Sequence, residues 1–113
     1  MSKLYGLPPS PFVQIVLALI AEFGWDVTLT PLDFKAGAHK KPEFLALNPR
    51  GQMPALEEEG SSLGESTAIQ RYLLATRESP DTFFPSDPKG RAVQDVYAGF
   101  EQGSFRKVAT ELY

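Results

Sequence analysis

Hydrophobic and polar positions follow different spacings along the first third of the chain, and each spacing predicts one element. Residues 3–5 form a short apolar segment that predicts a strand. Apolar residues then recur at helical intervals over residues 11–23, and Ser10, just before them, is a favourable N-cap. Residues 27–32 alternate between apolar and polar side chains, as a half-buried strand does. The start of the chain is therefore predicted to be strand, helix, strand.

The middle of the chain predicts a hairpin and a further helix. The expected elements are, in order, a polar loop at 33–41, a short helix at 42–47, a strand at 53–56, a turn at 57–60, a strand at 61–64 and a helix from 65. The close pair of strands predicts antiparallel pairing, whereas the initial strand–helix–strand order predicts a parallel pair with a right-handed crossover. Together they predict an α/β fold with a mixed sheet of about four strands flanked by helices.

The last third of the chain predicts a linker and an amphipathic helix. Residues 77–89 contain three prolines, and from Pro88 apolar residues recur at helical spacing up to Leu112. No later residue covers this stripe, and an uncovered apolar stripe is typical of a partner surface. We expect a short chain that self-associates or a fragment of a longer protein, ahead of completion by a second polypeptide.

Composition excludes several classes of function. The chain has 113 residues, 42% hydrophobic and 22% charged, which fits one ordinary globular domain. Its net charge of -3 argues against electrostatic binding of nucleic acid. The apolar stretch at 12–20 is too short to span a membrane. With no cysteine, the chain has no disulfide, thiolate nucleophile or cysteine zinc site, and we expect a cytoplasmic protein without a metal.

Two helix starts carry candidate chemistry. Glu65 and Ser66 open a helix directly after a strand, where free N–H groups favour a carboxylate and Glu65 can pair with an ammonium. Ser10 lies at the start of the first helix and could donate to a thiolate. The alternative for both sites is an ordinary helix cap.

Two other features are ambiguous on their own. Pro54 opens a strand, and one reason for such a proline is a cis peptide bond that leaves the backbone of Met53 free to pair with a peptide. The cluster of His39, Lys40 and Lys41 could bind a second carboxylate, or it could be a solvated loop.

Four segments resemble the signatures of the glutathione transferase family in order and spacing. They are the residues around Pro-Pro-Ser-Pro at 3–11, the His-Lys-Lys loop at 38–45, the Asn-Pro-Arg-Gly-Gln-Met-Pro-Ala-Leu segment at 48–56 and the Glu-Ser-Thr run at 65–73. The loop and the Gly-Gln-Met-Pro segment are most similar to the phi class, with theta-like enzymes next. Residues 84–89 are similar to the linker to the family's second domain.

The resemblance implies a domain organisation and a thioredoxin-like fold. Residues 1–76 would form a glutathione-binding domain with the order strand-helix-strand-helix-strand-strand-helix. Residues 77–88 would be a linker, and 89–113 would be the first part of the family's helical second domain.

The resemblance also implies how the thiol of glutathione is held. The Met53–Pro54 bond would be cis, and the backbone of Met53 would pair with the cysteinyl part of glutathione. Ser10 would donate a hydrogen bond to the sulfur. Some members of the family use a tyrosine near the end of the first strand instead, so Tyr5 is the rival to Ser10.

The two ends of glutathione have separate expected binding residues. Glu65 and Ser66, with Gln52 nearby, would hold the γ-glutamyl end. The glycyl carboxylate would be held by His39, Lys40 and, as a helper, Lys41. Arg50 departs from the pattern, because phi-class sequences usually have an aromatic residue there that locks into the neighbouring subunit.

The expected function is that of a glutathione transferase in detoxification. It would bind glutathione as co-substrate, with no cofactor, and activate its thiol for conjugation to a small hydrophobic electrophile or for peroxide reduction. We expect a homo-oligomer, such as a dimer, formed through the C-terminal helix. The alternative is a non-catalytic glutathione-binding or protein-interaction module of the same fold. Thiol–disulfide exchange is disfavoured because it needs a nucleophilic cysteine.

Overall fold

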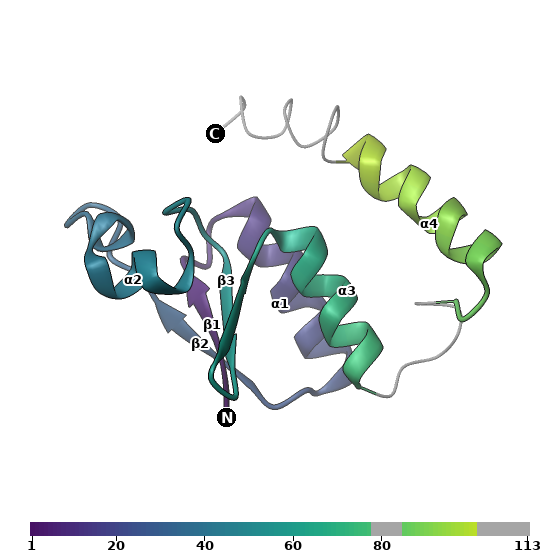
Figure 1. The fold of residues 1–113 in the computed structure, drawn as a ribbon, viewed down its shortest axis with the longest axis horizontal. Coiled ribbons are helices and arrows are strands. Elements are labelled where there is room, and N and C mark those ends of the chain that lie inside the picture. The colour runs from purple at the N-terminus through teal and green to yellow at the C-terminus, as the bar shows by residue number, and fades with distance from the viewer. Residues whose placement is uncertain (78–84, 102–113) are drawn as a thin grey trace. The chain divides into compact units, whose positions relative to one another are not determined.

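The computed structural model describes residues 1–77 and 85–101 (Figure 1). The elements of this part of the chain are β1 (Ser2–Gly6), α1 (Pro11–Phe23), β2 (Val27–Pro31), the 3-10 helix η1 (Ala38–Lys40), α2 (Pro42–Leu47), β3 (Ala55–Glu58), β4 (Ser61–Gly64), α3 (Ser66–Thr76) and α4 (Pro88–Phe100). The chain divides after Gln70 into two compact units.

A four-stranded mixed sheet in the order β2-β1-β3-β4 forms the centre of the first unit. β1 runs parallel to β2 and antiparallel to β3, and β3 and β4 form the antiparallel hairpin. The predicted α/β architecture and its mixed sheet are confirmed.

The two faces of the sheet pack against different helices. On the face toward α1, Leu4 and Leu56 are cross-strand neighbours and are almost fully buried. Gly6 lies on the same face, and a Cβ there would come within 2.5 Å of Val13 Cγ2, so the absence of a side chain lets α1 approach β1. On the other face, Ala55 packs with Phe44 of α2.

The C-terminus of α1 and the N-terminus of α4 both have hydrogen-bonded caps. α1 ends at Gly24, which has a left-handed φ of 64° and whose N–H donates to the carbonyl of Ile20. α4 begins after Asp87, whose side chain accepts a hydrogen bond from the N–H of Gly90 at 2.7 Å.

The third strand is displaced from its predicted position. The sequence pattern places it at 53–56, but β3 spans Ala55–Glu58, because Pro54 has no N–H for the ladder. The turn then shrinks to Glu59 and Gly60, with φ of 49° and 80°, which matches a two-residue hairpin turn with both residues left-handed. The predicted loop at 33–41 was also wrong in its last residues, which form η1.

The helix α4 of the second unit exposes an apolar stripe. Val93, Val96, Tyr97 and Phe100 are between 53% and 71% exposed. The expected continuation of this stripe at Phe105, Val108 and Leu112 lies outside the described residues, as does part of the predicted linker. Within residues 1–77 and 85–101, no helix has the length and apolar character needed to cross a membrane.

Candidate functional site

The topology brings the predicted site residues to one end of the sheet. Gly6 at the end of β1 is in register with Pro31 at the end of β2, and Ala55 at the start of β3 is in register with Gly64 at the end of β4. We call this the Gly6 end of the sheet. The segments that carry Ser10, His39 and Lys40, Met53 and Pro54, and Glu65 and Ser66 all begin or finish there.

Ser10 occupies the N-cap position of α1 but does not use its hydroxyl as a cap. Its backbone has φ −67° and ψ 127°, and its carbonyl accepts the N–H groups of Val13 and Gln14 at 3.1 and 2.9 Å. The side chain makes no hydrogen bond to the helix. The hydroxyl of Ser10 therefore lies at the positive end of the helix dipole without serving as the cap that the alternative interpretation requires.

The side chain of Met53, just before β3, is hydrogen-bonded to the loop that precedes α1. The N–H of Leu7 donates to Met53 Sδ at 3.3 Å, and the N–H of Ser10 donates to the carbonyl of Leu7 at 3.1 Å. The Met53–Pro54 bond is cis, as expected, and Pro54 is buried. The loop carrying Ser10 is thus held against the residue expected to pair with the cysteinyl backbone.

Asn48 supports the loop between α2 and β3 and was not predicted as a site residue. Asn48 is only 7% exposed, and its Nδ2 donates to the carbonyl of Gln52 at 2.7 Å. Its Oδ1 accepts the N–H of Arg50 at 3.3 Å. A Cβ on Gly64 would lie 3.1 Å from the Asn48 side chain, so the same amide also lies against the end of β4. The side chain of Gln52 is exposed.

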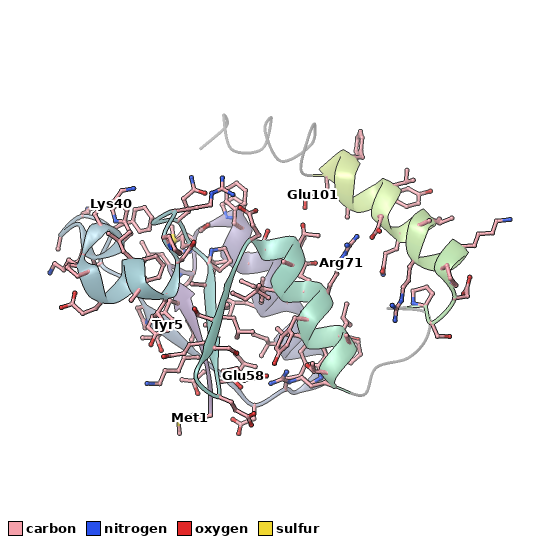
Figure 2. The ribbon with its side chains drawn as sticks, in the orientation of Figure 1. Met1, Tyr5, Lys40, Glu58, Arg71 and Glu101 are labelled. Atoms are coloured by element: carbon pink, nitrogen blue, oxygen red, sulfur yellow. The ribbon has the colours of Figure 1, made fainter. Side chains whose placement is uncertain are left out.

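Gly51 places this loop directly against η1. Its φ is 64°, and a Cβ there would lie 3.0 Å from both the carbonyl oxygen of His39 and Nζ of Lys40. Lys40 is exposed, and Figure 2 shows it where the chain enters α2. Lys41, in contrast, lines a pocket on the α2 face of the sheet together with Tyr5.

His39 is fixed by a stacked ring. Its imidazole lies parallel to the ring of Phe34, with centroids 3.8 Å apart and an angle of 4°. Its Nδ1 is buried without a hydrogen-bond partner, an unusual condition in a folded protein. A ligand approaching from solvent therefore cannot reach Nδ1 in this conformation.

Glu65 and Ser66 lie at the start of α3. Glu65 has a φ of 67°, a rare left-handed conformation for a residue with a side chain, and its carbonyl accepts the N–H of Ile69 at 2.9 Å. Ser66 is only 3% exposed. Arg50 Nη1 contacts Glu65 Oε1 at 2.5 Å, with the two side chains 66% and 53% exposed. No pattern in the sequence indicates this ion pair, which joins residues 15 positions apart.

The side chain of Tyr5 packs on the α2 face of the sheet (Figure 2). Its hydroxyl donates to Glu57 Oε1 at 2.9 Å, and its ring meets Phe44 edge-on at 6.2 Å. Burial, and then the hydrogen bond and charge of Glu57, raise the pKa of Tyr5 above its usual 10.0. This hydroxyl already has a carboxylate acceptor.

Comparisons with known proteins identify the family. The model of the glutathione S-transferase N-terminal domain matches residues 2–75. The chain is 41% identical to glutathione S-transferase 3 of Zea mays over 97% of this chain and 50% of that protein. It is 39% identical to a glutathione S-transferase of Hyoscyamus muticus over 97% of this chain and 52% of that protein. The chain belongs to the glutathione S-transferase N-terminal domain family.

Solved structures agree with this assignment. A delta-class glutathione transferase of Nilaparvata lugens matches with a TM-score of 0.92 and 34% identity, over 100% of this chain and 53% of that one. Glutathione transferase F2 of Populus trichocarpa matches with a TM-score of 0.82 and 36% identity, over 93% of this chain and 50% of that one. These matches confirm the expected thioredoxin-like fold. The chain spans about half the length of the curated relatives it matches.

Proposed function

We propose that this chain binds glutathione at the Gly6 end of the sheet and activates its thiol as a glutathione transferase does. The observation that carries the proposal is the position of Ser10. Its hydroxyl lies at the N-terminus of α1 and makes no cap hydrogen bond, so it can donate to a sulfur brought there. A hydrogen bond to the thiolate and the helix dipole both favour the charged form of the thiol.

The cysteinyl part of glutathione is proposed to pair with the backbone of Met53. The contact between Leu7 N–H and Met53 Sδ holds this residue beside the Ser10 loop. A peptide paired with Met53 would therefore have its side chain within reach of the serine.

The two ends of glutathione are proposed to extend in opposite directions from Met53. The γ-glutamyl end lies at Glu65 and Ser66, where a carboxylate and a helix start complement an amino-acid head group, with Gln52 nearby. The glycyl carboxylate lies at His39 and Lys40, which the close approach of Gly51 brings toward the same loop.

The domain organisation, the reaction and the oligomeric state are proposed on the basis of the same family resemblance. We propose residues 1–76 as the glutathione-binding domain, 77–88 as a linker and 89–113 as part of a helical domain. The reaction is conjugation of a small hydrophobic electrophile, or reduction of a peroxide, in cytoplasmic detoxification, with no cofactor beyond glutathione as co-substrate. The exposed stripe of α4 supports assembly into a homo-oligomer such as a dimer.

A second candidate is a non-catalytic glutathione-binding module. The proposed contacts to glutathione all come from residues 10–66, within the first unit, and none comes from α4. A binding site built entirely within one unit can retain its ligand whether or not an electrophile pocket accompanies it.

Calorimetric titration with glutathione, followed by an aryl-halide conjugation assay on the same sample, tests the proposal. We expect saturable binding and measurable turnover. Binding without turnover supports the non-catalytic module, and no binding contradicts both candidates. For a Ser10→Ala variant in these assays, Ser61→Ala is the matched control. Ser61 is exposed at the opposite end of the sheet, and its hydroxyl donates to the carbonyl of Glu58 at 2.9 Å.

A further inference from the structure

We propose that Arg50 determines specificity for the γ-glutamyl end of glutathione by binding its α-carboxylate while Glu65 binds its α-ammonium. The inference rests on the proposed function and adds a residue to it. Arg50 lies in the loop before β3, and the sequence alone did not predict that it binds glutathione.

The backbone of the loop holds Arg50 in place beside the proposed site. The N–H of Arg50 donates to Asn48 Oδ1 at 3.3 Å, and the next residue, Gly51, is fixed in a left-handed turn with a φ of 64°. Asn48 is itself buried. The guanidinium therefore projects from an anchored backbone rather than from a free loop.

The guanidinium has capacity beyond its contact with Glu65. It uses Nη1 to reach Glu65 Oε1 at 2.5 Å, and the Arg50 side chain is still 66% exposed. An arginine carries five N–H donors in a planar fork that suits a carboxylate. Within residues 1–77 and 85–101, the Arg50 side chain donates to Glu65 through Nη1, so its other N–H groups remain for a ligand.

The carboxylate of Glu65 can likewise serve two cations. Arg50 contacts Oε1, and a carboxylate has two oxygens with about four lone-pair sites. An incoming ammonium can bind Glu65 without displacing Arg50.

The charges of the pair complement those of the ligand. The γ-glutamyl end carries an ammonium and a carboxylate on one carbon. Glu65 and Arg50 present the opposite charges side by side, at the start of α3 where Ser66 is nearly buried. A helix start alone favours a carboxylate only modestly, so a guanidinium beside it would add a stronger, charge-assisted contact to the ligand carboxylate.

Two variants separate the charge of Arg50 from its shape. Arg50→Met removes the charge and keeps much of the length, whereas Arg50→Lys keeps the charge and removes the planar fork. Lys3→Met is the matched control, because Lys3 is an exposed cation on β1 whose register partner is Glu57, away from the loop. The pair is exposed, so we expect unfolding midpoints close to that of the unaltered chain.

Calorimetry with two probes tests the inference. The probes are glutathione and γ-aminobutyryl-cysteinyl-glycine, which retains the ammonium but lacks the α-carboxylate. We expect Arg50→Met to weaken glutathione binding about 10-fold, Arg50→Lys to weaken it less, and neither to change the weaker binding of the second probe. Lys3→Met should leave both affinities unchanged.

Several results would overturn the inference. Equal losses for both probes would make Arg50 a support for Glu65 alone, and tighter glutathione binding in Arg50→Met would make it a competitor of the ammonium. Unchanged affinity would remove Arg50 from the site while leaving the proposed function intact. If the unaltered chain does not bind glutathione, the proposed function fails first and the role of Arg50 fails with it.

Discussion

Replacing Ser10 by alanine removes the hydroxyl proposed to stabilise the thiolate of bound glutathione. A hydrogen bond to a charged group contributes about 1.5–3 kcal/mol, and each pKa unit corresponds to about 1.36 kcal/mol. We therefore expect Ser10→Ala to raise the pKa of the bound thiol by about one to two units. The helix dipole, which adds about 0.3–1 kcal/mol, remains in the variant.

The magnitude follows from the ordinary pKa of a thiol, about 8.5. The hydrogen bond and the dipole together lower it to roughly 6.5, so about three-quarters of the bound thiol is ionised at pH 7. A rise of about 1.5 units leaves about a tenth ionised, an approximately eightfold loss. The more basic thiolate is intrinsically more nucleophilic, which offsets part of the loss in turnover. The pKa is therefore a sharper readout than the rate.

The assay is the ultraviolet absorbance of the thiolate in the glutathione complex, followed as a function of pH. Glutathione affinity should stay within a few-fold, because the backbone of Met53 and both ends of the site are unaltered. Stability should also change little, because the hydroxyl of Ser10 does not cap α1. Ser61→Ala serves as the matched loss of a serine hydroxyl at the other end of the sheet.

An unchanged thiol pKa in Ser10→Ala would refute the mechanism. An equal shift in Ser61→Ala would show that the effect is not local to the site. A shift in Tyr5→Phe with none in Ser10→Ala would transfer the role to the tyrosine, against the structure, in which Tyr5 already donates to Glu57.

Three further predictions follow from other contacts. Ser66→Ala should weaken glutathione binding about 10-fold by calorimetry, through loss of a donor to the ligand carboxylate, and unaltered affinity would leave Ser66 a structural residue. The pKa of Tyr5 is raised, so the folded chain holds the phenol proton more tightly than the unfolded chain does. The difference in free energy of unfolding between the unaltered chain and Tyr5→Phe, measured with urea, should therefore be full below pH 10.0 and decline as the pH rises further. A difference that stays constant with pH would contradict this. Gly6→Ala should lower the free energy of unfolding by about 1–3 kcal/mol, since the added Cβ would come within 2.5 Å of the buried side chain of Val13, and a neutral effect would show that α1 can shift freely.

Local patterns were sufficient to predict much of the fold. The spacing of apolar residues predicted α1, and Gly24 marked its end, because both signals depend only on neighbours in the sequence. The hairpin was predicted, but β3 was placed two residues too early. Which residues enter the ladder depends on pairing with β1, and Pro54 cannot donate to it.

The candidate site was predicted from its motifs, but its side-chain contacts were not. The two helix starts supplied Ser10 and Glu65 as candidates, and the resemblance to a known family gave each a role. It gave no sign that Arg50 contacts Glu65, or that Asn48 supports both Gln52 and the end of β4. Such contacts join residues that only the folded chain brings together, so no local periodicity encodes them.

Lys41 illustrates the same limit. The sequence grouped it with His39 and Lys40 because the three are consecutive. In the fold, the carbonyl of His39 and the ammonium of Lys40 approach Gly51, whereas Lys41 lines the pocket on the α2 face. Neighbouring positions at the end of a short 3-10 helix point in different directions, and the sequence alone does not show where that helix lies.

The central claim is that glutathione binds at the Gly6 end of the sheet, and amide chemical-shift mapping by NMR tests it most directly. On titration with glutathione, the account predicts saturable shifts concentrated at the amides of Ser10, Met53 and Ser66 and around Lys40. The hairpin turn at Glu59 and Gly60, at the opposite end of the sheet, should be unaffected. No saturable shift, or shifts centred on that turn, would contradict the account.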